Sequence, residues 1–312
     1  MKSFSLRQLN VSIAEGKRIT YNKESAIILL KKKSKDSMEA FNRYSSIYDQ
    51  FNNIKDYESE ISVLENYIDF KIINKCLEIG AGTGTHASHV SKLLKLNNSM
   101  KTDTHMTLVD PNRSMLQVAK KKKYFVSTDF IINDFLSISM NSPKLFANYD
   151  LIYSLFHVVS YIPDSQLYFI LNSVAKNQKS GSYFVFDFWD SLAVQLHPPS
   201  KSERTIQGFN RIFRKRQIKK SKSRLKRIAY PKQIYSSLHS SLAYEINFVF
   251  FDIGKITQKK IFEETHYMYA HRYHEIREIL KPFYKTIASL DLVTGDDYSG
   301  KSYGHTLILE RL

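Results

Sequence analysis

A glycine-rich turn directly after an apolar segment constrains the fold of this chain more than any other feature of its sequence. Lys75 to Ile79 predict a buried strand, residues 80–84 read Gly-Ala-Gly-Thr-Gly, and the amphipathic stretch from His86 to Leu94 predicts a helix. Glycines let the backbone turn sharply and approach a ligand, and the first N–H groups of a helix are free to bind it. A turn without a ligand is the alternative, and three glycines in five positions argue against it.

Strands and helices alternate over the middle of the chain. Two helices are expected between residues 37 and 68, joined near Asn52 and Asn53. After the glycine turn we expect a strand at 106–109, a helix at 114–122, a strand ending at 131–132, a strand at 149–155, a helix at 166–175 and a strand at 183–187. This alternation predicts right-handed crossovers, a parallel sheet and an α/β fold.

The pattern changes after Trp189 to long β-rich segments, which predict an antiparallel extension over the sheet. Its strands are expected at 233–237, 243–251 and 259–268, and a helix at 274–280 with strands at 286–292 and 304–310 completes the α/β domain. We therefore expect an amino-terminal appendage (1–36), a core (37–190), a β-rich insert with a basic loop (191–270) and a carboxyl-terminal helix and strands (271–312).

Acidic side chains follow the second and third predicted strands. Asp110 ends the second strand, where a carboxylate can accept both hydroxyls of a ribose. Asp134 follows the third strand and can accept a hydrogen bond from an adenine amino group, while Phe135 or Met115 can pack on the ring faces. The sequence therefore accommodates one nucleoside. A dinucleotide site is disfavoured, because the glycine spacing lacks the last glycine of Gly-x-Gly-x-x-Gly.

At these positions the chain resembles the class I S-adenosylmethionine-dependent methyltransferases. Glu78 to Gly84 match their first motif, and Asp110 and Asp134 match their second-strand and third-strand acids, over about Phe41 to Asp187 and the last two strands. The resemblance implies a Rossmann-like sheet, mostly parallel with an antiparallel last strand, an antiparallel β-rich insert, and S-adenosylmethionine as cofactor. The cofactor-binding residues it implies are Tyr44, Tyr48, Lys55, Glu78, Gly80, Ala81, Gly82, Asp110, Pro111, Met115, Asp134, Phe135 and Ser154.

A narrower likeness concerns the acceptor. Tyr48-Asp49 followed by Lys55-Asp56-Tyr57 resembles the amino-terminal segment of deoxyaminosugar N-methyltransferases that act on nucleotide-linked sugars. Residues 156–161, Phe-His-Val-Val-Ser-Tyr, resemble the fourth-strand segment of methyltransferases found with surface-polysaccharide enzymes. In those relatives the tyrosine segment closes over the cofactor and the antiparallel insert shapes the acceptor pocket.

Methyl transfer from a sulfonium needs few catalytic groups, because it is an in-line displacement that depends on alignment and exclusion of water. His157, just after the fourth strand, is the first candidate base, and a histidine that only packs against the cofactor is an equally weighted alternative. Tyr161 is expected to assist or to be a core aromatic. Asp187 is expected to orient an amine or to cap a loop.

Positive charge is concentrated in one run. The formal net charge is +16, and residues 211–227 contain ten Lys and Arg and no acid. Such a run is usually a solvated loop. One functional interpretation is an anion clamp, in which a subset of Arg211, Arg214, Arg216 and Arg227 holds a diphosphate. The other is a surface that neutralises an RNA backbone. No metal site is expected.

Three functions are compatible with these features. The first is methyl transfer to the amine or hydroxyl of a small anionic acceptor, a nucleotide-linked sugar. The second is an RNA methyltransferase that uses the basic run, although residues 154–157 lack the Asn/Asp-Pro-Pro-Tyr motif of base N-methylating enzymes. The third is a non-catalytic methyltransferase-fold binding subunit, against which the intact glycine turn with Asp110 and Asp134 argues. Without an apolar run of about 20 residues, we expect no membrane span and a cytoplasmic protein.

Overall fold

The computed structural model describes residues 41–53, 55–98, 103–207, 224–234, 242–254, 257–291, 295–298 and 303–312. All of them belong to the unit Asp36–Leu312. None of the helices in these ranges has both the length and the apolar character needed to cross a membrane.

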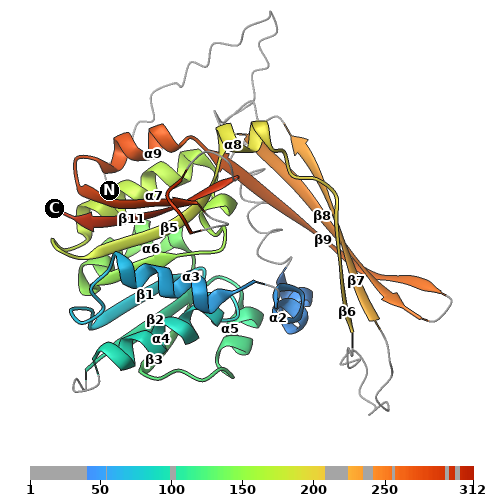
Figure 1. The fold of residues 1–312 in the computed structure, drawn as a ribbon, viewed down its shortest axis with the longest axis horizontal. Helices are drawn as coiled ribbons and strands as arrows, with labels where there is room; N and C mark the ends of the chain where they lie inside the picture. The colour runs from blue at the N-terminus through green and yellow to red at the C-terminus, as the bar shows by residue number, and fades with distance from the viewer. Residues whose placement is uncertain are drawn as a thin grey trace, which may run out of the picture. The chain divides into compact units, whose positions relative to one another are not determined.

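Seven strands form the core sheet (Figure 1). Five run parallel in the order β3-β2-β1-β4-β5, β11 pairs antiparallel with β5, and β10 pairs antiparallel with β11. This order, with its antiparallel last strand, confirms the expected Rossmann-like sheet. The strands are β1 (Lys75–Ile79), β2 (His105–Asp110), β3 (Ser127–Ile132), β4 (Leu151–Ser154), β5 (Tyr183–Asp190), β10 (Tyr284–Asp291) and β11 (Gly304–Arg311).

Helices cover both faces of the core sheet. Leu77 of β1 packs with apolar side chains of α6, α7 and α9, whereas its neighbour Cys76 packs with those of α3 and α4. Neighbouring residues of a strand point to opposite faces, so both faces of β1 are buried, as expected for a parallel sheet. The helices are α3 (Tyr57–Val63), α4 (Thr85–Asn97), α5 (Arg113–Ala119), α6 (Phe135–Asn141), η3 (Pro143–Asn148), η4 (Val159–Tyr161), α7 (Asp164–Asn177), α8 (Ser191–Leu196) and α9 (Tyr273–Leu280).

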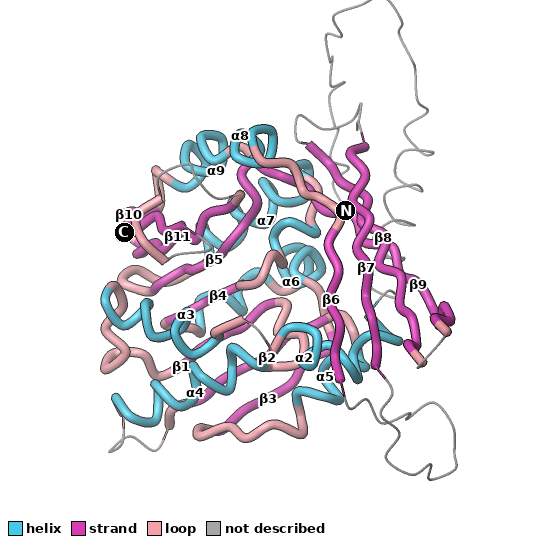
Figure 2. The backbone as a smooth tube through the Cα atoms, turned by 45° about the vertical axis from the view of Figure 1, so that its right-hand side comes forward, coloured by secondary structure: helices cyan, strands magenta, loops and turns pink. Residues whose placement is uncertain are grey.

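A second, antiparallel sheet continues from the end of β5. It consists of β6 (Ser202–Gln207), β7 (Arg224–Ile234), β8 (Leu242–Ile253) and β9 (Gln258–His271), and we call it the cap sheet. Trp189 and Asp190 of β5 pair in parallel with Ala270 and His271 of β9, so the two sheets are joined (Figure 2).

The amino-terminal segment, residues 41–66, lies between the core and the cap sheet. It contains η1 (Ser45–Ile47), α2 (Tyr48–Asn52), α3 and η2 (Leu64–Asn66), and its helices break after Asn52, as the sequence predicted. Tyr44 and Phe51 form an apolar cluster with Phe250 and Phe262 of the cap sheet. Aromatic packing therefore fixes this segment against the cap.

The end of the basic run is not the solvated loop that the sequence predicted. Residues 211–223, including most of its cations, lie outside the described residues, but Arg224 to Arg227 begin strand β7, and Arg227 is buried. Strand β7 thus starts well before the predicted 233–237, and β6 was not predicted at all. The alternation of exposed Arg224 and buried Leu225 is the strand signal that the charge run concealed.

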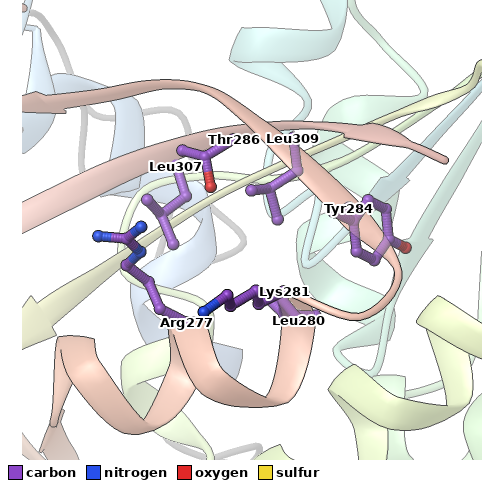
Figure 3. Close-up of a pocket in the computed structure, with 7 residues that line it drawn as sticks. All are labelled: Arg277, Leu280, Lys281, Tyr284, Thr286, Leu307 and Leu309. Carbon is purple, nitrogen blue, oxygen red and sulfur yellow. The ribbon is translucent and has the colours of Figure 1, made fainter.

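A cavity of about 270 Å³ lies between α9 and the strands β10 and β11 (Figure 3). Its lining residue Leu309 pairs with Phe184, near the start of β5, whereas the glycine turn follows the carboxyl end of β1. The cavity is therefore at the opposite edge of the sheet from that turn. Its lining residues are Arg277, Leu280, Lys281, Tyr284, Thr286, Leu307 and Leu309.

Candidate functional site

The glycine turn packs tightly at two positions and is open at the third. Gly80, Gly82 and Gly84 have φ of 74, 54 and 73°. A Cβ on Gly80 would lie 2.4 Å from Val158, and one on Gly84 would lie 2.2 Å from the Tyr124 hydroxyl, but a Cβ on Gly82 would meet no atom within 4 Å. The left-handed backbone at these residues favours glycine. Gly82 therefore offers the side of the turn that a ligand can approach.

Asp110 ties the second strand to this turn. Its carboxylate accepts hydrogen bonds from the N–H of Gly82 (2.8 Å) and of Asn112 (2.7 Å). Asn112 in turn caps α5 by accepting the N–H of Met115 at 3.0 Å. Burial raises the pKa of Asp110 to about 6, although both N–H groups oppose the shift. The second-strand acid, the half-buried Pro111 and the buried Met115 thus lie within a few residues beside the turn.

Glu78 is buried beneath the turn. It accepts a hydrogen bond from the Tyr153 hydroxyl at 3.1 Å, and burial raises its pKa to about 8. Ala81 is buried, and its N–H donates to the Val109 carbonyl. The Ser154 hydroxyl donates to the Ile79 carbonyl at 2.9 Å. These contacts hold the ends of β1, β2 and β4 together.

Asp134 and Phe135 begin helix α6. Asp134 accepts the N–H and the hydroxyl of Ser137, at 2.8 and 2.6 Å, so it caps the helix. Phe135 is buried and packs edge to face against Phe146. Its side chain is thus part of the core.

Asp49 binds the amino-terminal segment to the glycine turn. Its carboxylate accepts the Thr83 hydroxyl and lies 2.8 Å from the Lys122 ammonium group. The neighbouring ring of Tyr48 contacts Phe156 edge to face. Sequence reasoning assigned no role to Asp49, and its place directly after Tyr48 was the only local signal.

Lys55 and His86 share the carboxylate of Glu60. Lys55 Nζ and His86 Nε2 lie 2.8 and 3.0 Å from Glu60 Oε2. Lys55 Nζ also lies 4.0 Å from the centre of the Phe156 ring, a favourable cation–π distance. Burial alone would raise the pKa of Glu60, but His86 and Lys55 outweigh it and lower the pKa to about 2.

Glu60→Gln is expected to reduce the acid sensitivity of the fold. A carboxyl whose pKa is lowered by folding stabilises the protein above its unfolded pKa and loses that contribution as the pH falls through the folded pKa. For Glu60 the window is about pH 5 to 2, and the contribution is about 3 kcal/mol. Urea unfolding at several pH values should show a smaller loss of unfolding free energy in the variant. Glu58→Gln, which affects only the exposed pair with Lys92, is the matched control; an unchanged pH slope in Glu60→Gln would contradict this role.

The loop after β4 has an unusual backbone that Asp187 holds in place. Phe156 and His157 both have positive φ, 66 and 67°, which costs free energy for residues with side chains. The Asp187 carboxylate accepts both of their N–H groups, at 2.6 and 2.7 Å, and is fully buried. Burial raises the pKa of Asp187 to about 7, and Lys55 opposes the shift. Asp187 therefore positions His157 through the backbone.

The His157 ring lies among aromatic side chains. It stacks on Phe156 and contacts Trp189 and Tyr303, with ring centres 5.4, 5.8 and 5.9 Å away. Burial, and next the charge of Lys55, lower the pKa of His157 to about 3. The imidazole is therefore neutral near pH 7 and has a nitrogen that can accept a proton.

Tyr161 is joined to the cap sheet. Its hydroxyl lies 3.0 Å from Nδ1 of His266, a buried residue of β9. Burial lowers the pKa of His266 to about 3, so this imidazole is neutral as well. No local pattern distinguishes His266 from an ordinary polar residue of a strand, and only the pairing of β9 with β8 brings it to Tyr161.

Three buried polar atoms in this region have no hydrogen-bond partner among the described residues: the Tyr57 hydroxyl, His157 Nδ1 and Trp189 Nε1. Buried polar groups are nearly always satisfied, so unsatisfied groups that cluster around one space indicate a ligand. Tyr57 and His157 both contact Phe156, and Trp189 contacts His157. Together with the open side of Gly82, these atoms fit a polar ligand between the glycine turn and the β4 loop.

Comparisons with known proteins give one family and one fold. A family model described as a methyltransferase domain matches residues 74–241, more than half of the chain. The structure is similar to an S-adenosylmethionine-dependent methyltransferase from Clostridium acetobutylicum, with 16% identity and a TM-score of 0.61 over 86% of this chain and 98% of that one.

Two further similar structures are those of methyltransferases that act on sugars. CalS10, an amino pentose methyltransferase from Micromonospora echinaspora, is 11% identical with a TM-score of 0.55 over 96% of this chain and 100% of its own. The sugar N-methyltransferase KedS8 from a Streptoalloteichus species is 11% identical with a TM-score of 0.53 over 97% and 99%. Identities this low show the fold alone. No curated protein sequence matches the chain.

Proposed function

The chain belongs to the methyltransferase-domain family, and on that premise we propose that this S-adenosylmethionine-dependent methyltransferase acts on the amine or hydroxyl of a small acceptor, a nucleotide-linked sugar. The observation that carries this proposal is the position of His157, whose neutral imidazole lies at the carboxyl end of the core sheet among Phe156, Trp189 and Tyr303. CalS10 and KedS8 are sugar methyltransferases, which supports a sugar as the acceptor class.

The proposed cofactor site combines the glycine turn with the acids beside it. When bound, S-adenosylmethionine supplies the methyl group. Asp110 would accept the ribose hydroxyls, Asp134 would accept the adenine amino group, and Gly82 would let the cofactor approach the backbone. The amino-terminal segment closes the site, because Asp49 binds the turn and Lys55 lies over Phe156. Exclusion of water by this segment favours the displacement.

We assign His157 the role of base and Asp187 a positioning role. A pKa of about 3 would make His157 a weak base, so its unpartnered Nδ1 can accept the proton of an ammonium or hydroxyl group once the bound, polar acceptor has raised that pKa. Both oxygens of Asp187 accept backbone N–H groups of the β4 loop, so its assigned role is to hold that loop, and with it His157, in place. Tyr161 supports the pocket wall through His266.

Transfer of labelled methyl from S-adenosylmethionine into a cell extract tests the proposed function. Products are separated into small acid-soluble molecules and macromolecules, with and without ribonuclease. Label in a small, ribonuclease-independent product is expected, and mass spectrometry then locates the methylated amine or hydroxyl. Label in a ribonuclease-sensitive polymer would replace the sugar acceptor with RNA. No transfer, with cofactor binding lost as well, would favour a non-catalytic subunit.

A further inference from the structure

Two arginines face each other on the cap sheet. Arg204 of β6 and Arg227 of β7 are directly paired in the antiparallel register, so their side chains leave the sheet on the same face. Like charges in this arrangement destabilise a sheet. The neighbouring Lys226 points to the other face, where its ammonium group lies 2.5 Å from the Glu203 carboxylate. On the face of Lys226 the positive charge is therefore paired with a carboxylate, whereas on the face of Arg204 and Arg227 two positive charges lie side by side.

The arginine face is the one that packs on the amino-terminal segment. Arg227 is 8% exposed, and its guanidinium lies 5.7, 5.3 and 4.9 Å from the ring centres of Tyr44, Phe51 and Phe248. It donates to the Tyr44 hydroxyl, and Arg204 donates to the Phe51 carbonyl at 3.1 Å. These contacts hold both side chains in place.

Neither guanidinium has an acidic partner among the described residues: the ion pairs of the cap sheet in those ranges involve Lys201, Lys226 and Lys260 instead. A buried charge without a counter-charge is costly. Burial and the neighbouring Arg227 lower the pKa of Arg204, as expected when two cations are close together. An anion between the two arginines would remove this cost.

The pair borders the same space as His157. Arg227 donates to the Tyr44 hydroxyl, and the Tyr44 ring lies 5.1 Å from that of Tyr48. The Tyr48 ring contacts Phe156, on which the His157 ring stacks, so aromatic side chains link the pair to His157. Strand β6 lies beside α2 in Figure 2. The Arg227 guanidinium lies over the Tyr44 and Phe51 rings, so the arginine face is turned toward the amino-terminal segment.

We propose that Arg204 and Arg227 bind the phosphate groups of the acceptor while the reacting sugar lies near His157. This inference rests on the proposed function and deepens it, because it requires the acceptor to carry a phosphate ester or diphosphate. The planar guanidinium presents several N–H donors in a fork that matches phosphate oxygens. Two forks on adjacent strands suit a diphosphate better than a single anionic oxygen.

Calorimetric titration of the purified full-length protein with inorganic pyrophosphate tests the site. Wild type is expected to bind, and Arg204→Gln and Arg227→Gln to bind about tenfold or more weakly, because each loses charged hydrogen bonds. Lys226→Gln is the matched control: it removes the same charge from the opposite face and should bind like wild type. Pyrophosphate should also raise the Tm of wild type and Lys226→Gln but not of Arg204→Gln.

Binding of S-adenosylhomocysteine, measured in parallel, separates failure of this inference from failure of the proposed function. Unchanged affinity in the arginine variants shows that the fold and cofactor site are intact. Equal pyrophosphate binding by wild type and variants, or none by wild type, would overturn the phosphate site and leave the methyltransferase standing. If Arg204→Gln does not fold, Arg204→Lys, which keeps the charge but loses the fork, serves as the test.

A competition experiment identifies the source of the phosphate. Uridine diphosphate is expected to displace pyrophosphate from wild type, whereas a single-stranded oligonucleotide of about ten uridines should not, because Arg227 is too deeply buried for a polymer backbone. Displacement by the oligonucleotide at the same arginines would overturn the nucleotide-linked acceptor in favour of RNA.

Discussion

His157→Asn is expected to lower the rate of methyl transfer by about 100- to 10,000-fold while S-adenosylhomocysteine binds as tightly as in wild type. The imidazole is the only neutral base that the structure brings to this part of the described site with an unpartnered nitrogen beside Phe156 and Trp189. Asparagine is the appropriate replacement, because position 157 has φ of 67° and asparagine tolerates the left-handed region. The loss should therefore report the missing proton acceptor and not a rearranged loop.

Single-turnover transfer to the acceptor found by labelling is the measurement. His274→Asn, on an exposed part of α9, is the control and should keep the wild-type rate. Because burial lowers the pKa of His157, the imidazole is neutral near pH 7, and its protonation should not limit the rate there. A rate in His157→Asn equal to wild type would show that this histidine only packs against its neighbours.

Asp187→Asn is expected to lower the rate of methyl transfer through its effect on the position of His157. In wild type each carboxylate oxygen of Asp187 accepts one backbone N–H, from Phe156 or from His157. The asparagine amide has only one oxygen, so its NH2 group would lie against the other N–H group, which cannot accept a hydrogen bond. If Asp187 acts by holding His157, the double variant should be no slower than the slower single variant. Independent, additive losses would contradict this coupling.

Asp110→Ala is expected to weaken S-adenosylhomocysteine binding by about 10- to 100-fold, from loss of charge-assisted hydrogen bonds worth about 1 to 3 kcal/mol. The carboxylate is buried and already ties Gly82 to the second strand, so its removal affects the ribose contact and the shape of the turn together. Since burial raises the pKa of Asp110 to about 6, wild-type affinity should also decline as the pH falls below about 6.

Calorimetry with S-adenosylhomocysteine measures the effect, and thermal unfolding of the ligand-free protein separates binding from stability. Asp129→Ala is the control, because Asp129 is an exposed acid on β3 that pairs with His105. A lower Tm with unchanged affinity would mean that Asp110 only supports the turn and that the ribose lies elsewhere.

The core fold could be predicted from local patterns. The strand from Lys75 to Ile79 has the predicted limits, and the core helices and strands predicted after it lie within a few residues of their expected positions, whereas helix α6 was not predicted. The glycine turn, Asp110 and Met115 lie together because parallel strands bring their carboxyl ends to one edge of the sheet. Local patterns did not predict where the side chains of Ser154 and Phe135 point. In the structure the Ser154 hydroxyl donates to the Ile79 carbonyl, and the Phe135 ring packs against Phe146 in the core.

The cap sheet could not be predicted with the same success. Arg204 and Arg227 are separated by residues that include the most basic part of the chain, and their pairing depends on the register of two antiparallel strands. A shift of one residue would exchange the faces of Arg227 and Lys226. Nothing local distinguishes these two cations.

The sequence alone determined the α/β core, the glycine turn and the acids that follow each strand, because these features depend on contacts and periodicities within short stretches of chain. Tertiary structure alone decided the partners of the charged side chains. Asp49 binds Thr83 and Lys122, Glu60 binds His86, Asp187 binds backbone N–H groups of the β4 loop, and Arg204 lies opposite Arg227. The free energy of a buried charge is set by the partners that surround it, and those partners come from distant segments whose pairing no local pattern encodes.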